Sequence, residues 1–289
     1  MKLLKDVLLS EYTTYKIGGV AKQFVVVSTV EELSQVLVQL SRAKERYMVL
    51  GKGSNTLFDD RGFNGTVILN KIVDIEWQEE SVRVGAGYSF ALLGVQASRK
   101  ELSGLEFASG IPGTVGGAVY MNAGANGLEV KDVIATVEYI DREGKTHLLQ
   151  RNDLKFAYRW SMFHEMEGAI AGATFQLSRS SQAKQKQKEI LDYRMATQPY
   201  KTKNCGCVFR NPEGHSAGRL IDECGLKNTT IGGATISPLH ANFIENRGNA
   251  TAKEIIELMS FIQRTVKERT GIQLEEEVRK IPFEESQDG

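Results

Sequence analysis

The sequence has few cysteines, no excess of charge of either sign and no long hydrophobic run. Three cysteines, an odd number, argue against a disulfide scaffold and for a reducing compartment. Lysine plus arginine equals aspartate plus glutamate, 36 each, which gives no indication of binding to nucleic acid or an anionic membrane. No apolar run could cross a bilayer, and residues 1–16 lack the continuous apolar core of a signal peptide. We therefore expect a cytoplasmic protein without a nucleic-acid or membrane partner. We also expect a monomer, although the composition does not determine the oligomeric state.

The composition is that of a globular protein, with 41% hydrophobic and 25% charged residues. A chain of 289 residues can form two or three domains. Thr29 and Glu32 have the spacing of a capping box and predict the start of a helix. Predicted strands are residues 23–27, 47–50, 66–70, 81–85, 133–140, 146–150 and 169–177.

The last third of the chain is set apart by a polar, lysine-rich run, residues 178–190. This composition favours a solvated helix or a linker, so we place a domain boundary there. Further on, Thr251 and Glu254 form a second capping box, and Gly271 marks the end of that helix.

Two glycine clusters are the strongest local signals. In "LGKGSN", residues 50–55, Gly51 and Gly53 follow a strand, and successive backbone N–H groups there can surround a phosphate. The spacing is neither that of a Walker A loop nor that of a Rossmann fingerprint, and for this cluster alone a structural turn is the better explanation. Six glycines within residues 109–127 indicate backbone packed closely against something extended. A dinucleotide or a set of tight bends would satisfy this pattern.

A third cluster, "TTYKIGG" at residues 13–19, makes a long ligand that contacts several loops more plausible. Together these stretches resemble the UDP-N-acetylenolpyruvoylglucosamine reductase family. The resemblance extends over "YTTYKIGG", "LGKGSNTLF", "SGIPGTVGGAVYMNAGANG", "FAYRWSMF", "CGCVFRNP", "SPLHANFIEN" and "GIQLEEEVR", from residue 12 to residue 279. The modest length is similar to the shorter subclass of the family.

The resemblance implies an α+β fold with a two-part FAD-binding module of the vanillyl-alcohol-oxidase (PCMH) type. Its parts would be residues 1–69, with the tail 276–289 returning to them, and residues 70–180. Residues 190–275 would form the substrate-binding domain. The positions that match non-covalent FAD contacts are Gly51, Lys52, Gly53, Ser54, Asn55, Gly110, Ile111, Pro112, Gly113, Thr114, Gly116 and Gly117.

The resemblance also implies a reaction in peptidoglycan precursor synthesis. NADPH, as co-substrate, reduces FAD, and the flavin N5 delivers a hydride to C3 of an enolpyruvyl ether on a UDP-sugar. A proton donor then completes the reaction at C2, giving UDP-N-acetylmuramate. Developing negative charge requires preorganised donors. Arg159 matches the catalytic arginine of the family, and a guanidinium suits a carboxylate.

Other positions follow from the same resemblance. Glu277 matches the catalytic glutamate, with Glu275 as the alternative register. Asn211 matches a substrate contact, and Arg210 stands where the family often has lysine. His240 is expected to be structural.

Cysteine replaces serine at the proton-donor position, since "GCVF" stands where the family has Gly-Ser-x-Phe. A thiol is a far stronger acid than an alcohol, so Cys207 can serve as the catalytic proton donor. Cys205 and Cys224 are expected to be small apolar residues. A zinc site is disfavoured because four ligands at suitable spacing are missing, and a Cys205–Cys207 disulfide would close a strained ring.

Two other functions remain open on sequence grounds. The first is an FAD-dependent oxidase of the same fold that acts on another small substrate. The second is a non-catalytic nucleotide-binding module. The motifs in the last third of the chain favour the reductase.

Overall fold

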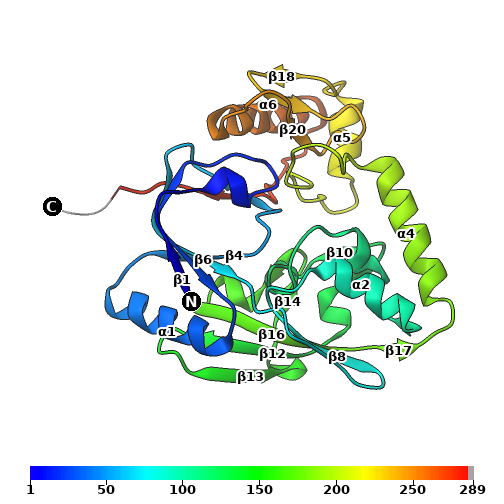
Figure 1. Ribbon diagram of the computed structural model, residues 1–289. Coiled ribbons are helices and arrows are strands. Elements are labelled where there is room, and N and C mark those ends of the chain that lie inside the picture. The colour runs from blue at the N-terminus through cyan, green and yellow to red at the C-terminus, as the bar shows by residue number, and fades with distance from the viewer. Residues whose placement is uncertain (286–289) are drawn as a thin grey trace. The chain divides into compact units, whose positions relative to one another are not determined.

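The computed structural model describes residues 1–285, and the chain forms two compact units. The first unit contains residues 1–4, 23–51 and 65–194. The second contains residues 5–22 and 52–64 and the described residues from 195 onward. Neither unit is a continuous segment, because the chain changes unit at several points before residue 195. Figure 1 shows the elements of both units along the chain.

The first unit is built on two sheets. One has the order β13-β12-β16-β8-β7, and the other has the order β1-β3-β6-β4. Its helices are α1 (Val30–Arg42), α2 (Phe90–Arg99), α3 (Val115–Tyr120) and most of α4 (Ala183–Thr197). Its strands are β1 (Lys2–Leu4), β4 (Tyr47–Leu50), β7 (Ile75–Trp77), β8 (Ser81–Gly85), β9 (Leu102–Ser103), β10 (Gly124–Ala125), β11 (Leu128–Glu129), β12 (Ile134–Asp141), β13 (Thr146–Gln150), β14 (Phe156–Ala157), β15 (Trp160–Ser161), β16 (Gly168–Gln176) and β17 (Ser178–Arg179), with parts of β3 (Val20–Val27) and β6 (Gly62–Asn70).

Strand β16 is buried on both faces, which explains its unbroken apolar sequence. Ala171 packs into the cluster that contains α1, whereas Ala173 packs into the cluster that contains α2. Alternation alone would put both residues on one face. The pairing with β12 has a register shift between Glu138 and Tyr139, and this bulge reverses the direction of the later side chains.

The second unit packs a small sheet, β18-β19-β20, with α6 and α5. Its helices are α5 (Ala217–Glu223) and α6 (Ala252–Thr270), and its strands are β2 (Val7–Leu8), β5 (Thr56–Phe58), β18 (Thr230–Ile231), β19 (Ala234–Ile236), β20 (Ile244–Asn246) and β21 (Arg279–Ile281). The core combines Leu258, Met259 and Ile262 of α6 with Tyr15 and Leu57 from the N-terminal segments.

The chain after α6 returns to the N-terminal segments of the second unit. Strand β21 pairs in parallel with β5, and Arg279 lies opposite Thr56. Asn55 extends this contact, because its side chain donates to the carbonyl of Glu277 at 3.2 Å and its own carbonyl accepts from Arg279 N–H at 3.1 Å. Residues 286–289 of the predicted tail lie outside the described residues.

The predicted elements are confirmed, with small differences at their ends. Thr29 accepts a hydrogen bond from Glu32 N–H at 3.2 Å, and the Thr251–Glu254 capping box is complete at the start of α6. Helix α6 ends at Gly271, whose φ is 75°. The polar run after residue 178 forms the helix α4.

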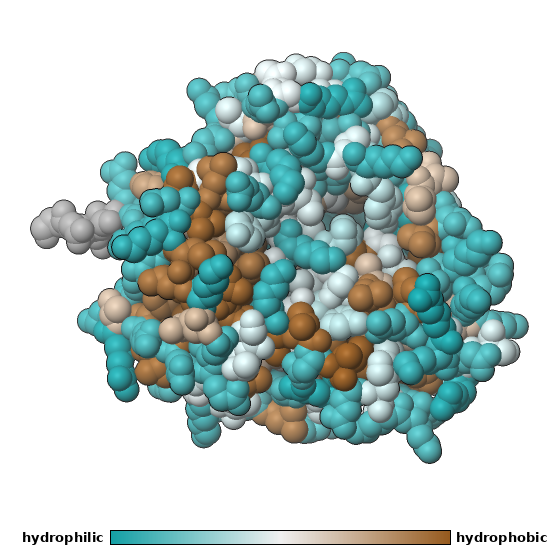
Figure 2. Space-filling view, viewed as in Figure 1, coloured by the Kyte–Doolittle hydropathy of each residue, from teal (hydrophilic) through white to brown (hydrophobic). Residues whose placement is uncertain are grey.

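The surface of the face shown in Figure 2 carries many hydrophilic side chains between patches of hydrophobic ones. Among residues 1–285, no helix combines the length and the apolar character needed to cross a membrane.

Candidate functional site

The loop 51–55 packs closely at both of its glycines, against a side chain at Gly51 and against backbone at Gly53. In the first unit, a Cβ at Gly51 would lie 2.3 Å from Thr114 Oγ1, so the loop rests on the second predicted cofactor segment. In the second unit, Gly53 has a φ of 59°, and a Cβ there would lie 2.5 Å from the Tyr12 carbonyl oxygen. The structure therefore requires glycine at both positions. It brings two of the predicted cofactor segments together at Gly51 and Thr114.

The segment 109–117 contains one side-chain polar group that the described residues do not use, and one glycine that packing does not explain. The hydroxyl of Ser109 is buried and has no hydrogen-bond partner among the described residues. A Cβ at Gly117 would meet only Thr114 Oγ1, at 3.5 Å, whereas one at Gly116 would meet the Ala86 Cβ at 2.9 Å. Protein packing thus accounts for Gly116, but Gly117 is exposed and needs another reason. An unused buried donor and an open glycine fit a closely bound cofactor. Ser109 opens the quoted motif and was not among the predicted contacts.

The third glycine cluster is explained by packing within the protein. A Cβ at Gly18 would lie 3.0 Å from the Phe58 Cβ, and one at Gly19 would lie 2.3 Å from the Asp60 carbonyl oxygen. These glycines allow residues 18–19 to pack on residues 58–62, so they give no support for a ligand contact.

Arg159 occupies the turn of the β14–β15 hairpin with a φ of 56°, an uncommon conformation for a residue with a side chain. Its Nη2 donates to the carbonyl of Gly124 at 3.2 Å, and its Nη1 lies 3.8 Å from Glu129 Oε1. Gly124 and Glu129 are paired residues of the β10–β11 hairpin. The guanidinium is therefore positioned by a second hairpin and is 19% exposed.

Glu129 is at the centre of this arrangement, and the sequence reading missed it. Asn122 Nδ2 donates to Glu129 Oε2 at 3.0 Å and to the Ala157 carbonyl at 2.9 Å, which joins the two hairpins. Lys131 Nζ also contacts Glu129, at 2.6 Å, and this hydrogen bond raises the pKa of Lys131. A sequence signal did exist, because Asn-Gly at residues 126–127 is the most typical two-residue hairpin turn.

Cys207 follows a tight turn in the second unit. Asn204 Oδ1 accepts a hydrogen bond from Gly206 N–H at 3.0 Å, and Gly206 has a φ of 85°. A side chain at Gly206 would therefore be strained even though the space around it is open. Cys207 is half-buried, and all three cysteines are free thiols.

Glu277 lies on the segment paired with the cysteine loop. Its N–H donates to the Val208 carbonyl at 2.8 Å, directly after Cys207. The two neighbouring glutamates, Glu275 and Glu276, have other partners. Glu275 is 75% exposed and lies 3.9 Å from Arg210, and Glu276 forms an ion pair with Lys280 at 2.7 Å. The backbone bond to Val208 places Glu277 on the strand segment that pairs next to Cys207, and the choice of Glu277 over Glu275 stays a prediction.

Cys205 is fully buried, and its hydrophobic surroundings fit the expected apolar role. Burial raises the pKa of the Cys205 thiol, and the charges of Cys207 and Glu277 raise it further. Tyr15, whose hydroxyl lies beside this thiol, also has a raised pKa, mainly because of burial. Cys207 and Glu277 therefore act on the pKa of Cys205 within the second unit.

Arg210 and Asn211 follow the same loop. The Nε of Arg210 is buried and has no hydrogen-bond partner among the described residues. Asn211 Oδ1 accepts from Ala217 N–H at 3.0 Å at the start of α5. His240 has structural contacts, since its Nδ1 accepts from Asn242 N–H at 3.3 Å and its ring packs edge-on against Phe243.

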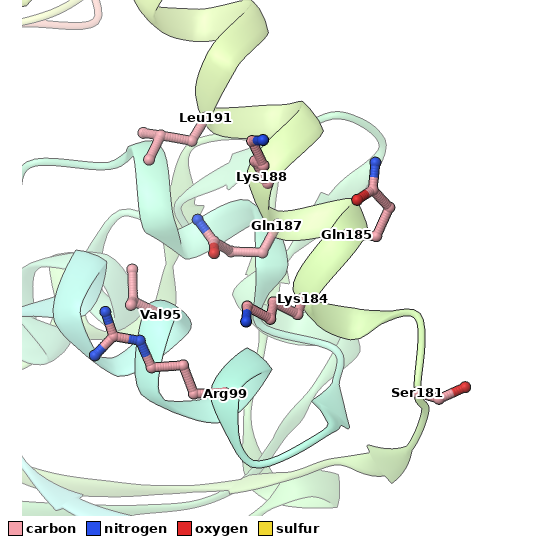
Figure 3. Close-up of a pocket in the computed structure, with 8 residues that line it drawn as sticks. All are labelled: Val95, Arg99, Ser181, Lys184, Gln185, Gln187, Lys188 and Leu191. Carbon is pink, nitrogen blue, oxygen red and sulfur yellow. The ribbon is translucent and has the colours of Figure 1, made fainter.

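A separate cleft of about 720 Å³ lies between α2 and α4 of the first unit. In Figure 3 the Gln187 side chain extends from α4 toward α2. Arg99, Lys184 and Lys188 make the cleft positively charged. Its lining residues are Val95, Arg99, Ser181, Lys184, Gln185, Gln187, Lys188 and Leu191, none of which is a predicted site residue.

Comparison with known proteins matches both parts of the chain. The family model of the FAD binding domain matches residues 21–150, and that of the UDP-N-acetylenolpyruvoylglucosamine reductase C-terminal domain matches residues 198–281. The reductase of Protochlamydia amoebophila is 53% identical over 97% of this chain and 94% of its own length. The reductase of Chlamydia muridarum is 48% identical over 97% of this chain and 95% of its own length. The crystal structure of the reductase from Thermus caldophilus has a TM-score of 0.84 at 38% identity, covering 98% of this chain and 100% of its own.

The fold and the matched domains define an oxidoreductase with an FAD-binding domain. More particularly, the chain belongs to the UDP-N-acetylenolpyruvoylglucosamine reductase family. The resemblance, the α+β fold and FAD as the cofactor, all predicted from the sequence, are thereby confirmed. The relatives named above act on a UDP-sugar, as their name states. Of the three predicted catalytic residues, Cys207 and Glu277 belong to the second unit and Arg159 to the first.

Proposed function

We propose that this chain uses NADPH and FAD to reduce the enolpyruvyl ether of UDP-N-acetylenolpyruvoylglucosamine, forming UDP-N-acetylmuramate. The names of the relatives at up to 53% identity support the reaction. One observation of the structure supports the assignment of the chemistry. Glu277 N–H bonds to the Val208 carbonyl, which pairs the predicted proton-donor segment with the predicted acid.

The residues of the chain bind, orient and protonate the substrate in this proposal. FAD, when bound, would supply the hydride-transfer chemistry that links NADPH to the enolpyruvyl group. Residues 51–55 and 110–117 would hold FAD through backbone N–H groups, with the buried Ser109 hydroxyl as an additional donor. The glycine at 117 leaves room for close approach of the cofactor.

Cys207 supplies the proton in this assignment. Its S–H bond breaks as the new C–H bond forms at C2, and the resulting thiolate takes a proton from water before the next turnover. A thiol with a pKa of ~8.5 is an adequate acid toward a carbanion. Glu277 would stabilise the enolic oxygens of the substrate, either protonated or through a water molecule.

Two arginines would bind the charged groups of the substrate. Arg159 presents a planar guanidinium that suits the substrate carboxylate, and its contacts to Gly124 and Glu129 restrict its movement. Arg210 has a buried unused Nε–H that suits a diphosphate or carboxylate oxygen, and Asn211 follows it as a further substrate contact.

The test is substrate-dependent NADPH oxidation, with the flavin spectrum near 450 nm followed alongside. Cys207→Ser should retain substantial turnover, because a hydroxyl can also deliver a proton. Cys207→Ala should lose about 100-fold or more, in line with general acid catalysis. A fully active alanine variant would exclude Cys207 as the donor, and NADPH oxidation that does not require the enolpyruvyl sugar would exclude the reaction.

We further propose that the enzyme is a cytoplasmic monomer, without nucleic-acid or membrane partners. The equal numbers of acidic and basic residues and the three thiols, which form no disulfide, support this assignment.

The division of the chain into parts 1–69, 70–180 and 190–275 stays a prediction. Sedimentation of the FAD-loaded protein would measure its oligomeric state.

A further inference from the structure

We propose that Asn242 is a positioning residue that holds Cys207 and Glu277 in their reactive arrangement. It would act through the backbone of residues 208–210 and need not touch the substrate. This inference rests on the proposed function, in which Cys207 donates the proton. It assigns a role in catalysis to a buried side chain outside the loops that carry the chemistry.

The side chain of Asn242 pairs with both backbone polar groups of one residue, Phe209. Phe209 N–H donates to Asn242 Oδ1 at 3.0 Å, and Asn242 Nδ2 donates to the Phe209 carbonyl at 2.8 Å. The carbonyl of Asn242 also accepts from Val208 N–H at 2.9 Å. A primary amide has the donor and acceptor of a peptide group, so Asn242 takes the place of a neighbouring β-strand.

The opposite side of the same segment pairs with the segment that carries Glu277. Val208 accepts from Glu277 N–H at 2.8 Å, and Arg210 N–H donates to the Glu275 carbonyl at 2.8 Å. Phe209 and Glu276 form an antiparallel bridge between them. Residues 208–210 are therefore the middle of a three-part ladder.

The pairing of Asn242 with Phe209 is buried, so no other group can replace it. Asn242 is 2% exposed and Phe209 is 1% exposed, so water cannot replace a lost hydrogen bond. Without the amide, the N–H and carbonyl of Phe209 would be buried and unpaired, and the segment would have to move to satisfy them. Cys207 directly precedes this segment and Glu277 bonds to it, so both would be displaced. A misplacement of about 1 Å at a reacting group can cost about 100-fold in rate.

Asn246 provides a matched control. It is also buried, and both of its side-chain polar groups are used. Its Nδ2 donates to the Tyr15 carbonyl at 2.9 Å, and its Oδ1 accepts from Ala250 N–H at 2.9 Å. These bonds do not involve residues 207–210 or 275–277. Asn246→Ala therefore removes comparable bonds from the same unit without releasing the ladder.

The experiment measures three rates on FAD-loaded enzyme for Asn242→Ala, Asn242→Asp and Asn246→Ala. These are flavin reduction by NADPH, flavin reoxidation by the enolpyruvyl sugar, and alkylation of Cys207 by iodoacetamide, read by mass spectrometry. Both Asn242 variants should slow reoxidation by about 10- to 100-fold. They should change flavin reduction by less than about twofold and alter the Cys207 alkylation rate. Asn246→Ala should leave all three rates near those of the wild type.

Asn242→Asp adds a readout that a purely structural role would not produce. An ionised aspartate cannot donate to the Phe209 carbonyl, but a protonated one can. The reoxidation rate of this variant, divided by the wild-type rate at each pH, should therefore rise as pH falls. Taking the ratio removes every titration that the two proteins share.

Two results would overturn the proposal. One is a loss of reoxidation in Asn246→Ala as large as in Asn242→Ala. The other is unchanged reoxidation together with unchanged Cys207 alkylation in the Asn242 variants. Failure of the proposed function is seen separately, as full reoxidation by Cys207→Ala. The alkylation rate reports the placement of Cys207 whether or not that thiol donates the proton, so it still tests Asn242.

Discussion

At the scale of single residues, two adjacent glycines in the same motif have different reasons to be glycine. A Cβ at Gly116 would meet Ala86 at 2.9 Å, whereas one at Gly117 would meet only a hydroxyl at 3.5 Å. We expect Gly116→Ala to lower the free energy of unfolding by about 1–3 kcal/mol through overpacking. Gly117→Ala should fold normally but bind FAD about tenfold more weakly. This corresponds to a loss of about 1.4 kcal/mol in the free energy of binding. Urea unfolding and FAD titration of both variants would measure the difference, and equal FAD affinities would contradict it.

Glu129 gives a second prediction at this scale. Glu129→Gln keeps a hydrogen-bond acceptor for Asn122 but removes the negative charge 3.8 Å from Arg159. We expect flavin reoxidation by the substrate to slow by about tenfold, about 1.4 kcal/mol, while reduction by NADPH stays unchanged. Lys131→Met removes the other cationic partner of Glu129 and should leave both rates unchanged. Stopped-flow absorbance of the two half-reactions measures these effects, and a parallel fall in both would show that Glu129 serves only stability.

The predicted site residues and the residues that position them differ in how well a sequence reveals them. Arg159 and Cys207 stand in recognisable motifs, so a resemblance is enough to select them. Asn242 and Glu129 act through contacts that depend on pairing between distant segments. The Asn-Gly turn at residues 126–127 indicates the hairpin that carries Glu129, but nothing in the local spacing indicates the contact of Glu129 with Arg159 or that of Asn242 with Phe209. A single sequence therefore predicts the reacting groups better than the groups that hold them.

At the scale of elements, helix α6 shows how caps set the ends of a helix. Gly271 has a φ of 75°, and a Cβ there would meet nothing within 4 Å, so the cost of a side chain is conformational only. Gly271→Ala should lower the free energy of unfolding by about 1 kcal/mol. Gly248 has equally open surroundings without a positive φ, and Gly248→Ala should be nearly neutral. Denaturant unfolding compares the two, and similar losses would refute the backbone explanation.

Element positions were well predicted where local signals dominate. The capping boxes at Thr29 and Thr251 fixed the starts of α1 and α6, and the short apolar runs fixed most strands. The bulge in the pairing of β16 with β12 was not predictable, because it depends on which faces the two sheets bury. The short hairpins β10–β11 and β14–β15 were also missed, since their strands have only two residues each.

At the scale of the whole molecule, two buried acidic groups should make stability depend on alkaline pH. Burial raises the pKa of the Cys205 thiol and of the Tyr15 hydroxyl. Both stay protonated in the folded chain at pH values where an unfolded thiol, pKa ~8.5, and phenol, pKa ~10, ionise. The unfolded state then binds fewer protons. The free energy of unfolding should therefore fall above about pH 8.5, by up to about 1.4 kcal/mol per pH unit for each group.

Urea unfolding at a series of pH values would measure this dependence. Cys205→Ala should flatten the decline that begins near pH ~8.5, and Tyr15→Phe should flatten the part above about pH 10. Cys224→Ala removes a buried sulfur from the same core and serves as the control. Slopes identical to the wild type in both test variants would contradict the assignment.

The interleaving of the two units sets an order on synthesis. The second unit needs residues 5–22 and 52–64 from the beginning of the chain and β21 from its end. Asn55 and Glu277, which bond to each other, are 222 residues apart. During synthesis, the N-terminal segments of that unit therefore have no pairing partner until β21 has been made. During that time the first unit gains most of its own sequence. The pairing of β5 with β21 joins residues far apart in the sequence, and contacts of this kind are slow to form during folding.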